Sequence, residues 1–417
     1  MIKKIFLPVL VFFSLATFAQ QATSSPYSFY GIGDVRFRGT VENRLMGSVA
    51  VFPDSIHINL QNPASYAGLK LSTFTIGAGY NQTNLESYQG KDKAQRTTVD
   101  YMAIGMPIFN KATVAFGLMP YSSVGYRVST GDYVPRILRY NGEGGLNRVF
   151  VGYGYEINKS LSLGVDMFYN FGSIETTNTQ YLTGLEVQNG AMEINRSEMS
   201  GLSFRFGAMY QKKWDKRNLF ASVSVTPQSN LRSNNTRTVS SVSLVPEGVT
   251  PTILDSFDPI TDKNTLKLPT QLTVGLGYGE AKKWMLGTEL LLKQSSSFGN
   301  RFDDLTQASF ENGFQYSVGG YYVPNYSAFS GYFKRVTYRA GFRYEKTGLV
   351  IRQESIKDYA VTGGFGFPLG GLFSNINLGV EYGRRGTAKA NLVEENYTNV
   401  IMSFSFNDKW FVRSKYD

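Results

Sequence analysis

The sequence predicts an all-β protein, a transmembrane antiparallel β-barrel of about fourteen strands with an N-terminal luminal plug. Three observations predict it. Apolar and polar residues alternate with a period of two along many segments. The connections between these segments alternate between long and short. After the first 19 residues no run approaches 18 consecutive apolar residues, so no transmembrane helix is expected.

The alternation is clearest between residues 161 and 172, where odd positions are apolar and even positions, such as Asp166, are mostly small or polar. The same pattern recurs in residues 271–279, 334–344 and 375–383. One face of each segment suits lipid and the other suits a lumen. Fourteen candidate strands centre on residues 71–81, 97–107, 112–124, 147–157, 161–172, 199–210, 218–228, 269–279, 283–294, 313–323, 334–345, 355–367, 373–384 and 396–406.

The connections predict the topology. Outer-membrane barrels have long extracellular loops and short periplasmic turns, so we expect both termini to be periplasmic. Residues 324–333 and 346–354 break the contrast, because the first should be short and the second long. We expect Trp214, Trp284 and Trp410 at the periplasmic rim, where indole rings favour the membrane interface. The expected long connections are 82–96, 125–146, 173–198, 229–268, 295–312 and 385–395, and the short ones are 108–111, 158–160, 211–217, 280–282 and 368–372.

The first 19 residues predict a cleaved signal peptide. Lys3 and Lys4 precede an apolar run, and small residues before Gln20 suit a cleavage site. The expected divisions are therefore a signal peptide at 1–19, a plug at 20–70 and a barrel at 71–417, in the outer membrane. The chain has no cysteine, which excludes lipoprotein, disulfide and thiol chemistry.

The net charge predicts lipid rather than nucleic acid as the partner. The formal charge of +10 becomes +8 once Lys3 and Lys4 are removed, and the basic residues are scattered without a basic run. We therefore expect contact with outer-membrane lipid and the phosphates of lipopolysaccharide, and no nucleic-acid binding.

The segment before the first strand does not alternate, and Pro26, Pro53 and Pro63 interrupt it. About fifty residues are too many for a simple connection, and a fourteen-stranded barrel is too wide for its own side chains to fill. A plug inside the lumen accounts for both observations; a periplasmic tail is the alternative. Proline keeps Asn62 extended and asparagine bonds its own backbone, so Asn62, Pro63 and Ala64 predict a structural corner rather than a ligand site.

Residues 48–69, which contain Asn62-Pro63-Ala64, resemble the N-terminal hatch of the FadL/TodX-like family of fatty-acid and hydrocarbon transporters. Residues 25–34 resemble the mature start of such barrels in the Bacteroidota branch, and residues 407–417 resemble their C-terminal end. The resemblance implies fourteen strands, a luminal hatch and passage of hydrophobic molecules sideways from the hatch into the membrane.

Little in the sequence indicates catalysis. His57 is the only histidine, so a Ser-His-Asp site or a His/Cys metal site has almost no ligands to draw on. We expect no enzyme activity, no metal and no cofactor, and we expect His57 to pack or to hydrogen-bond. Residues 31–33 and 142–145 are glycine-rich but lack the context of a phosphate loop, so we interpret both as turns.

Arg335, Arg339 and Arg343 recur every four residues, which predicts that all three share the luminal face of one strand. Charge on the lipid face would cost roughly 2–4 kcal/mol per arginine at mid-bilayer. The ladder would either bind a carboxylate-bearing amphiphile or be neutralised by acidic residues, which is the favoured interpretation. Candidate partners are Asp166, Glu289 and Glu381 on the wall and Asp34, Glu42 and Asp54 in the plug.

Two functions remain open on the sequence. The first and preferred one is passive, plug-gated transport of small hydrophobic or amphipathic molecules. The second is a non-transporting barrel that serves as a subunit of a larger outer-membrane secretion or assembly complex, with outer-membrane protein partners.

Overall fold

The computed structural model describes residues 23–88, 90–129, 136–182, 189–246, 248–298, 308–369 and 374–410. The predicted signal peptide lies outside the described residues. The chain forms a closed antiparallel barrel of 14 strands, as predicted. Hydrogen bonding between β19 and β2 closes the ring, from Asp408↔Ser72 to Glu394↔Glu86. None of the described helices is long and apolar enough to cross a membrane.

The barrel strands follow one another around the ring, and two of them are interrupted. β8 and β9 form one strand that breaks at Pro227, and β11 and β12 form another that breaks at Pro269. The remaining short strands β1, β10 and β14 attach to the ring locally. The bounds are β1 Asp34–Val35, β2 Ser72–Ser87, β3 Gly90–Phe109, β4 Ala112–Ser129, β5 Arg136–Asn158, β6 Leu161–Leu182, β7 Asn189–Trp214, β8 Arg217–Thr226, β9 Ser229–Ser243, β10 Ile253–Ser256, β11 Ile260–Leu268, β12 Gln271–Glu280, β13 Trp284–Lys293, β14 Ala308–Phe310, β15 Gly313–Tyr322, β16 Thr337–Ile351, β17 Glu354–Pro368, β18 Asn375–Gly386 and β19 Glu394–Asp408.

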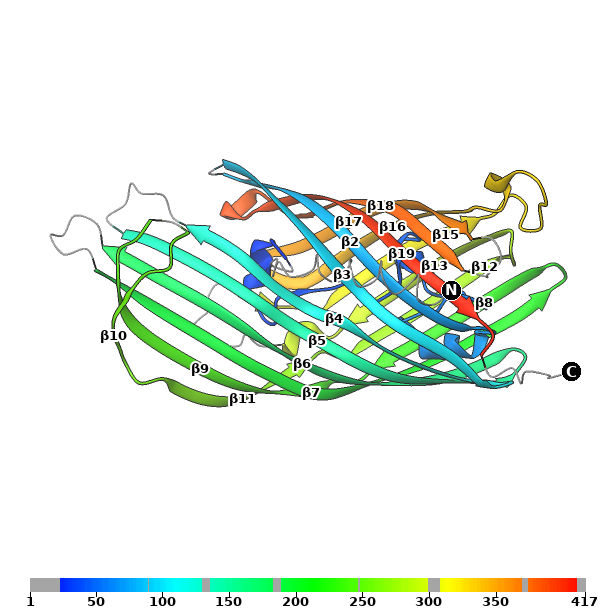
Figure 1. The fold of residues 1–417 in the computed structure, drawn as a ribbon, viewed down its shortest axis with the longest axis horizontal. Coiled ribbons are helices and arrows are strands. Elements are labelled where there is room, and N and C mark those ends of the chain that lie inside the picture. The colour runs from blue at the N-terminus through cyan, green and yellow to red at the C-terminus, as the bar shows by residue number, and fades with distance from the viewer. Residues whose placement is uncertain are drawn as a thin grey trace, which may run out of the picture.

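Several predicted long loops are strands instead. β5, β6, β7, β9 and β11 continue far past the predicted boundaries and form a tall sheet at one end of the barrel (Figure 1). Their polar residues alternate without an apolar face, so the sequence pattern did not mark them as strands. Residues 142–145, interpreted as a turn, lie within β5, although Gly144 and Gly145 have φ of 104° and 148°.

The two connections that break the predicted alternation of long and short have different structures. β16 and β17 are joined by a tight turn at Arg352 and Gln353, which both have positive φ, so the nine-residue connection expected at 346–354 is strand except at this turn. Residues 323–336, by contrast, form a genuinely long connection that contains the 3₁₀ helix η5 Tyr332–Lys334. This long connection lies at the same end of the barrel as the short turns between the other strands. We call this end the short-turn end (Figure 1).

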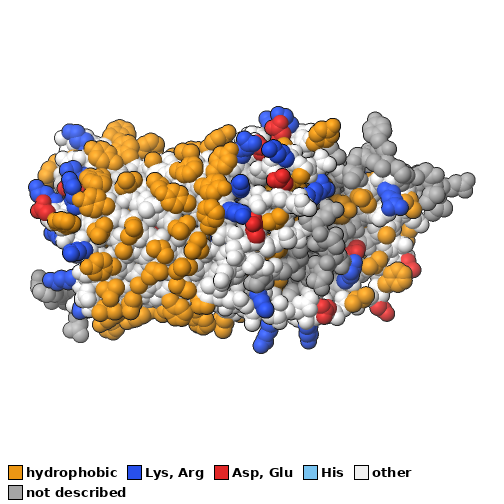
Figure 2. Space-filling model, turned by 180° about the vertical axis from the view of Figure 1, so that it is seen from behind, with side chains coloured by type: hydrophobic (Ala, Val, Ile, Leu, Met, Phe, Trp, Pro, Cys, Tyr) orange, Lys and Arg blue, Asp and Glu red, His pale blue; other side chains and the backbone are white. Residues whose placement is uncertain are grey.

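On the face shown in Figure 2, apolar side chains form a belt over the half of the barrel next to the short-turn end, and polar residues predominate on the other half. Leu163, Met167 and Tyr169 are exposed on the outer face of β6, whereas Asp166 and Asn170 are buried inside, as their alternation predicted. Trp214, Trp284 and Trp410 all lie at the short-turn end, the end that the sequence predicts to be periplasmic.

The N-terminal segment, residues 23–71, packs against the inner face of the strands. It contains η2 Pro26–Phe29, α2 Val41–Arg44 and η3 Pro63–Gly68. η3 contacts β5, β6 and β7 on one side of the ring, and α2 contacts β18 and β19 on the other. Leu45, Val49 and Val51 are fully buried there. The segment therefore touches opposite sides of the wall.

The barrel wall opens between β3 and β4, which are hydrogen-bonded over only part of their length. These strands pair only from Phe109↔Ala112 to Met102↔Leu118, at the end next to their turn. Beyond that point β3 pairs with β2 alone, and β4 pairs instead with β1 of the N-terminal segment through Asp34↔Ser123. Figure 1 shows β3 and β4 diverging.

Candidate functional site

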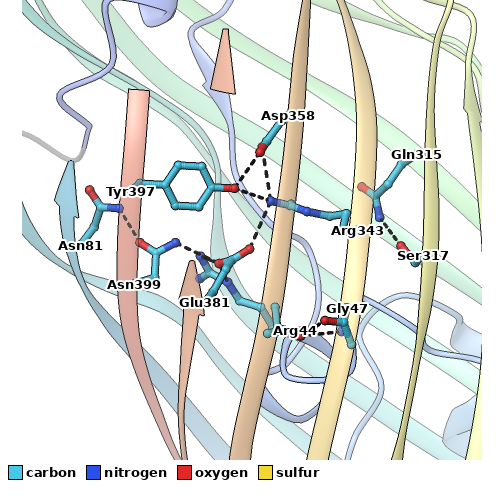
Figure 3. A network of polar contacts seen from close by, with 12 residues as sticks. Arg44, Gly47, Asn81, Gln315, Ser317, Arg343, Asp358, Glu381, Tyr397 and Asn399 are labelled. Carbon is cyan, nitrogen blue, oxygen red and sulfur yellow. Dashed lines mark hydrogen bonds and ion pairs between the residues drawn. The ribbon is translucent and has the colours of Figure 1, made fainter. Parts of the chain in front are cut away.

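The interior of the barrel contains a network of charged side chains centred on Glu381 of β18 (Figure 3). Arg44 of α2 donates from Nε to Glu381 Oε2 at 2.7 Å, and Arg343 of β16 donates to Oε1 at 3.1 Å. Asn399 of β19 donates to Oε2 at 2.9 Å. Because the Glu381 side chain is 2% exposed, this carboxylate joins the segment to the wall away from solvent.

Arg343 has further partners on neighbouring strands. Its guanidinium lies 3.3 Å from Asp358 of β17 and donates to the hydroxyl of Tyr397 at 3.0 Å. Tyr397 in turn donates to Asp358 at 2.7 Å. Arg343 therefore lies between two carboxylates of the wall, Glu381 and Asp358, of which only Glu381 was a candidate partner in the sequence.

The other two arginines of the predicted ladder separate. Arg339 is buried in the lumen and donates to Asn377 Oδ1 at 2.8 Å, and Asn377 donates to Glu42 Oε1 at 2.8 Å. Arg335 is not on the ladder, because β16 begins only at Thr337. The Arg335 guanidinium carbon lies 5.5 Å from the ring centroid of Tyr332, in the connection before the strand.

Polar contacts also hold the segment to the wall elsewhere in the barrel. The backbone N–H of Ala50 donates to Glu289 at 2.9 Å, and Arg205 donates to the carbonyl of Leu60 at 2.6 Å. Arg205 also lies 3.7 Å from Asp166. Near the end of β18 that lies away from the short-turn end, Arg385 donates to Asp34 at 2.6 Å. Charged or polar groups thus hold the segment at several points around the ring.

Asn62, Pro63 and Ala64, which were predicted to form a corner, lie at the start of η3. The Asn62 side chain caps η3 by accepting from the Ala64 N–H at 3.0 Å, and it donates to the carbonyl of Val223 at 3.2 Å. Gly164 lies so close beneath that an added Cβ would come within 2.3 Å of the Pro63 carbonyl carbon. The corner fits the wall because glycine faces it.

His57 pairs with Asp54 at the periphery of the segment, Nδ1 to Oδ2 at 2.9 Å. Burial would raise the pKa of Asp54, but the charge and hydrogen bond of His57 outweigh it and lower this pKa to about 2. Burial would lower the pKa of His57, but Asp54 outweighs it and raises this pKa. The pair is a local hydrogen bond, the role expected for His57.

Cavities lie beside the segment, and two of them are lined by described residues of the segment and the wall. One of about 100 Å³ lies between residues 34–37 and strands β2, β3 and β17–β19, and five arginines and five carboxylates line it. Another of about 80 Å³ lies on the far side of residues 35–38, next to Glu289, Lys293 and Glu345. Each has room for several water molecules. Their charged linings favour water and small polar solutes over a hydrophobic molecule.

Arg44, Asp358 and Tyr397 belong to the network but were not predicted from the sequence. Asp358 stands on the same face of its strand as Ala360 and Thr362, which are buried, so its alternation could have identified it as luminal. Arg44 gave no such signal, because it lies in a four-residue helix without a strand pattern. Among the described residues, no group of three or more metal-ligating side chains could hold a metal ion.

Comparison with known proteins gives one family and several similar folds. A family model described as BamG matches residues 1–417. The fold is similar to a FadL homologue of Pseudomonas aeruginosa, with a TM-score of 0.61 and 12% identity over 90% of this chain and 100% of that one. It is also similar to the toluene transporter TodX of Pseudomonas putida, with a TM-score of 0.58 and 15% identity over 91% of this chain and 100% of that one.

A deletion mutant of the TodX monoaromatic hydrocarbon channel gives a TM-score of 0.62 with 16% identity, over 88% of this chain and 98% of that one. No curated protein matches the chain by sequence. At these identities the structural likeness shows the FadL-like barrel fold, which is an outer-membrane fold.

Proposed function

This chain belongs to the BamG family, and we propose that it is a sealed, non-transporting barrel subunit of a larger outer-membrane secretion or assembly complex. The family name indicates a role in an assembly complex, and the FadL-like fold supports placement in the outer membrane. In this proposal the signal peptide is removed, the short-turn end faces the periplasm and residues 23–71 are a permanent plug.

The observation that carries the proposal is the attachment of the segment through buried charge. Arg44 and Asp34 bind two side chains of β18, Glu381 and Arg385. The backbone N–H of Ala50 binds buried Glu289 of β13. Separating one partner of a buried ion pair costs about 3–5 kcal/mol, because the other charge stays behind without compensation. Moving the segment would break several such contacts together, so it is built to stay in place.

The lining of the cavities supports the same function. A transporter of hydrophobic molecules needs an apolar pocket, because apolar pockets with few polar groups are what bind such ligands. The cavities beside residues 34–38 carry paired charges instead. An assembly subunit needs only that the lumen be closed to solutes.

The proposal is tested by tagging the chromosomal copy and extracting it in mild detergent. We expect stoichiometric recovery with at least one other outer-membrane protein. Depletion of the chain should lower the amounts of other outer-membrane proteins while uptake of a radiolabelled hydrocarbon stays unchanged. Recovery of the chain alone, together with normal levels of other outer-membrane proteins after depletion, would contradict the proposal.

Transport of a hydrophobic molecule is the second candidate, favoured by the division of the wall between β3 and β4. In the described part of the chain, β1 alone takes the place of β3 beside β4, through Asp34↔Ser123 and Val35↔Ser122. Departure of β1 would open a lateral exit. Transport therefore requires that β1 leave β4, since a ligand drives opening only by favouring one of two arrangements.

A disulfide separates the two candidates. Val35→Cys with Ser122→Cys places cysteines at directly paired positions of antiparallel strands, a separation that suits a disulfide. The chain has no cysteine of its own to interfere. In a sealed subunit the oxidised and reduced proteins should behave alike. Hydrocarbon uptake that is lost on oxidation and restored by reductant would favour transport.

A further inference from the structure

The long connection at the short-turn end, residues 323–336, exposes a group of aromatic side chains. Phe329 is fully exposed and Phe333 is 70% exposed, and Tyr326 and Tyr332 are each more than 40% exposed. We call residues 323–336 the aromatic turn. It contains no acidic residue, and Lys334 and Arg335 follow its aromatic residues. Such a surface is unusual in a turn that faces only water.

The aromatic turn has a defined conformation. The N–H of Asn325 donates to the carbonyl of Lys334 at 2.8 Å and closes the base of the turn. The Tyr332 hydroxyl donates to the carbonyl of Pro368 at 3.1 Å, which ties the turn to the end of β17. The exposure of Phe329 and Phe333 is therefore a property of the folded turn.

The turn continues the outer apolar belt. Tyr322, exposed at the end of β15, leads into it, and the Tyr338 hydroxyl at the start of β16 donates to the carbonyl of Phe333 at 3.3 Å. Tyr338 packs edge-on against exposed Phe365 of β17, with ring centroids 5.5 Å apart. Figure 1 shows the turn projecting from the barrel at this end.

Cationic groups surround the aromatic side chains. Lys282, from the neighbouring turn between β12 and β13, lies 4.8 Å from the ring centroid of Tyr326. Lys334 and Arg335 lie on the other side, next to Tyr332. Aromatic rings favour the boundary between acyl chains and headgroups, and lysine and arginine there face the lipid phosphates.

We propose that the aromatic turn is a membrane-interface anchor that inserts Phe329 and Phe333 among the phospholipids at the short-turn end of the barrel. Because the aromatic turn continues the lipid-facing belt, we take lipid to be what surrounds it. Its rim of lysine and arginine can bind the phosphate headgroups. The anchor fixes the depth and tilt of the barrel near β15–β17. This inference stands independently of the function proposed above.

The test uses full-length protein in vesicles of phosphatidylethanolamine and phosphatidylglycerol. Ser330→Cys carries an environment-sensitive fluorophore on the aromatic turn, and Lys159→Cys carries it on the β5–β6 turn at the same end, which has no aromatic residue. We expect blue-shifted emission and quenching by lipids labelled near the headgroup only at position 330. Quenching by aqueous iodide should be at least about threefold weaker there than at position 159.

Phe329→Ser combined with Phe333→Ser should restore iodide quenching at position 330, with folding checked by heat-modifiable migration in gels. Equal iodide access at positions 330 and 159 in vesicles would overturn the proposal. Equal access in vesicles but protection in native outer membranes would also overturn it, and would identify a protein as the occupant instead.

Discussion

Glu381 of β18 accepts Arg44 of the N-terminal segment at 2.5 Å, across 337 positions of the sequence. The same carboxylate accepts Arg343 from the wall, so one buried acid compensates two arginines. This arrangement makes Glu381 the residue on which the attachment of the segment depends most directly.

Glu381→Gln should therefore destabilise the protein strongly. Both arginines lose their shared counter-charge, but Arg343 keeps Asp358 and Arg44 keeps Asp100. The expected loss is therefore about 1.5–3 kcal/mol in the free energy of unfolding, the range for hydrogen bonds to charged groups. Urea titration in detergent micelles measures it. Glu193→Gln is the matched control, because the Glu193–Arg237 pair is partly exposed and should contribute less than about 1 kcal/mol. Equal, small effects would show that Glu381 does not hold the segment.

Arg339→Ala distinguishes structure from ligand binding at the predicted ladder. Arg339 donates to Asn377, which donates to Glu42 of the segment. Its removal should lower the unfolding temperature and leave hydrocarbon uptake unchanged, as measured by thermal unfolding and by uptake into cells. Reduced uptake with an unchanged unfolding temperature would support a substrate role for Arg339 instead.

The Asp54–His57 pair predicts a pH dependence that can be measured directly. The folded pKa of Asp54 is lowered to about 2 and that of His57 is raised. The contribution of Asp54 is present above its ordinary pKa of 3.8 and is lost as the pH falls towards 2. The contribution of His57 is present below its ordinary pKa of 6.5 and is lost as the pH rises through its folded pKa. The pair thus stabilises the segment most between these two ordinary values.

Because His57 is the only histidine, its ring protons can be followed by NMR without assignment. The titration midpoint should lie above 6.5 and fall in Asp54→Asn, which keeps the shape of the side chain and removes its charge. A midpoint that does not move in Asp54→Asn would rule out Asp54 as the cause.

The sequence predicted every barrel strand because a period of two is a local property, and each strand that crosses lipid carries an apolar face. The prediction failed beyond the apolar face of a strand. β7 begins at Asn189, ten residues before its predicted start at 199, because its first residues do not alternate clearly between apolar and polar. It also assigned Arg335 to the ladder, since spacing alone does not show where a strand begins.

The site was predicted only in part, because sequence patterns show local structure and not contacts between distant residues. Alternation placed Arg343 and Glu381 in the lumen, but their partner Arg44 lies in a short helix far away in sequence. That pairing exists only after the barrel has closed around the segment. The Asn62 corner was predictable because proline and asparagine act on their own backbone.

The orientation of the barrel predicts a labelling pattern on cells. Asn234 is exposed in β9 of the tall sheet, and Lys159 is exposed in a short turn at the opposite end. Asn234→Cys should react with a membrane-impermeant maleimide on intact cells, and Lys159→Cys should react only after the outer membrane is permeabilised. The reverse pattern would invert the proposed topology.

The fit between η3 and its wall predicts the effect of a single methyl group. Gly164 of β6 lies directly beneath Pro63, and an added Cβ would lie 2.3 Å from the Pro63 carbonyl carbon and 2.5 Å from the Ala64 nitrogen. Both atoms belong to backbone, so a side-chain rotation cannot relieve the overlap. Gly164→Ala should cost about 1–3 kcal/mol and displace the corner.

Displacement of the corner should open a path for ions, which single-channel recording in planar bilayers detects as a conductance absent from the unsubstituted protein. Gly363→Ala of β17 is the matched control, because the nearest atom to its added Cβ is 3.8 Å away, an ordinary contact. If Gly164→Ala is as stable and as non-conducting as Gly363→Ala, then the segment tolerates movement at the corner, and a permanent seal at Pro63 is wrong.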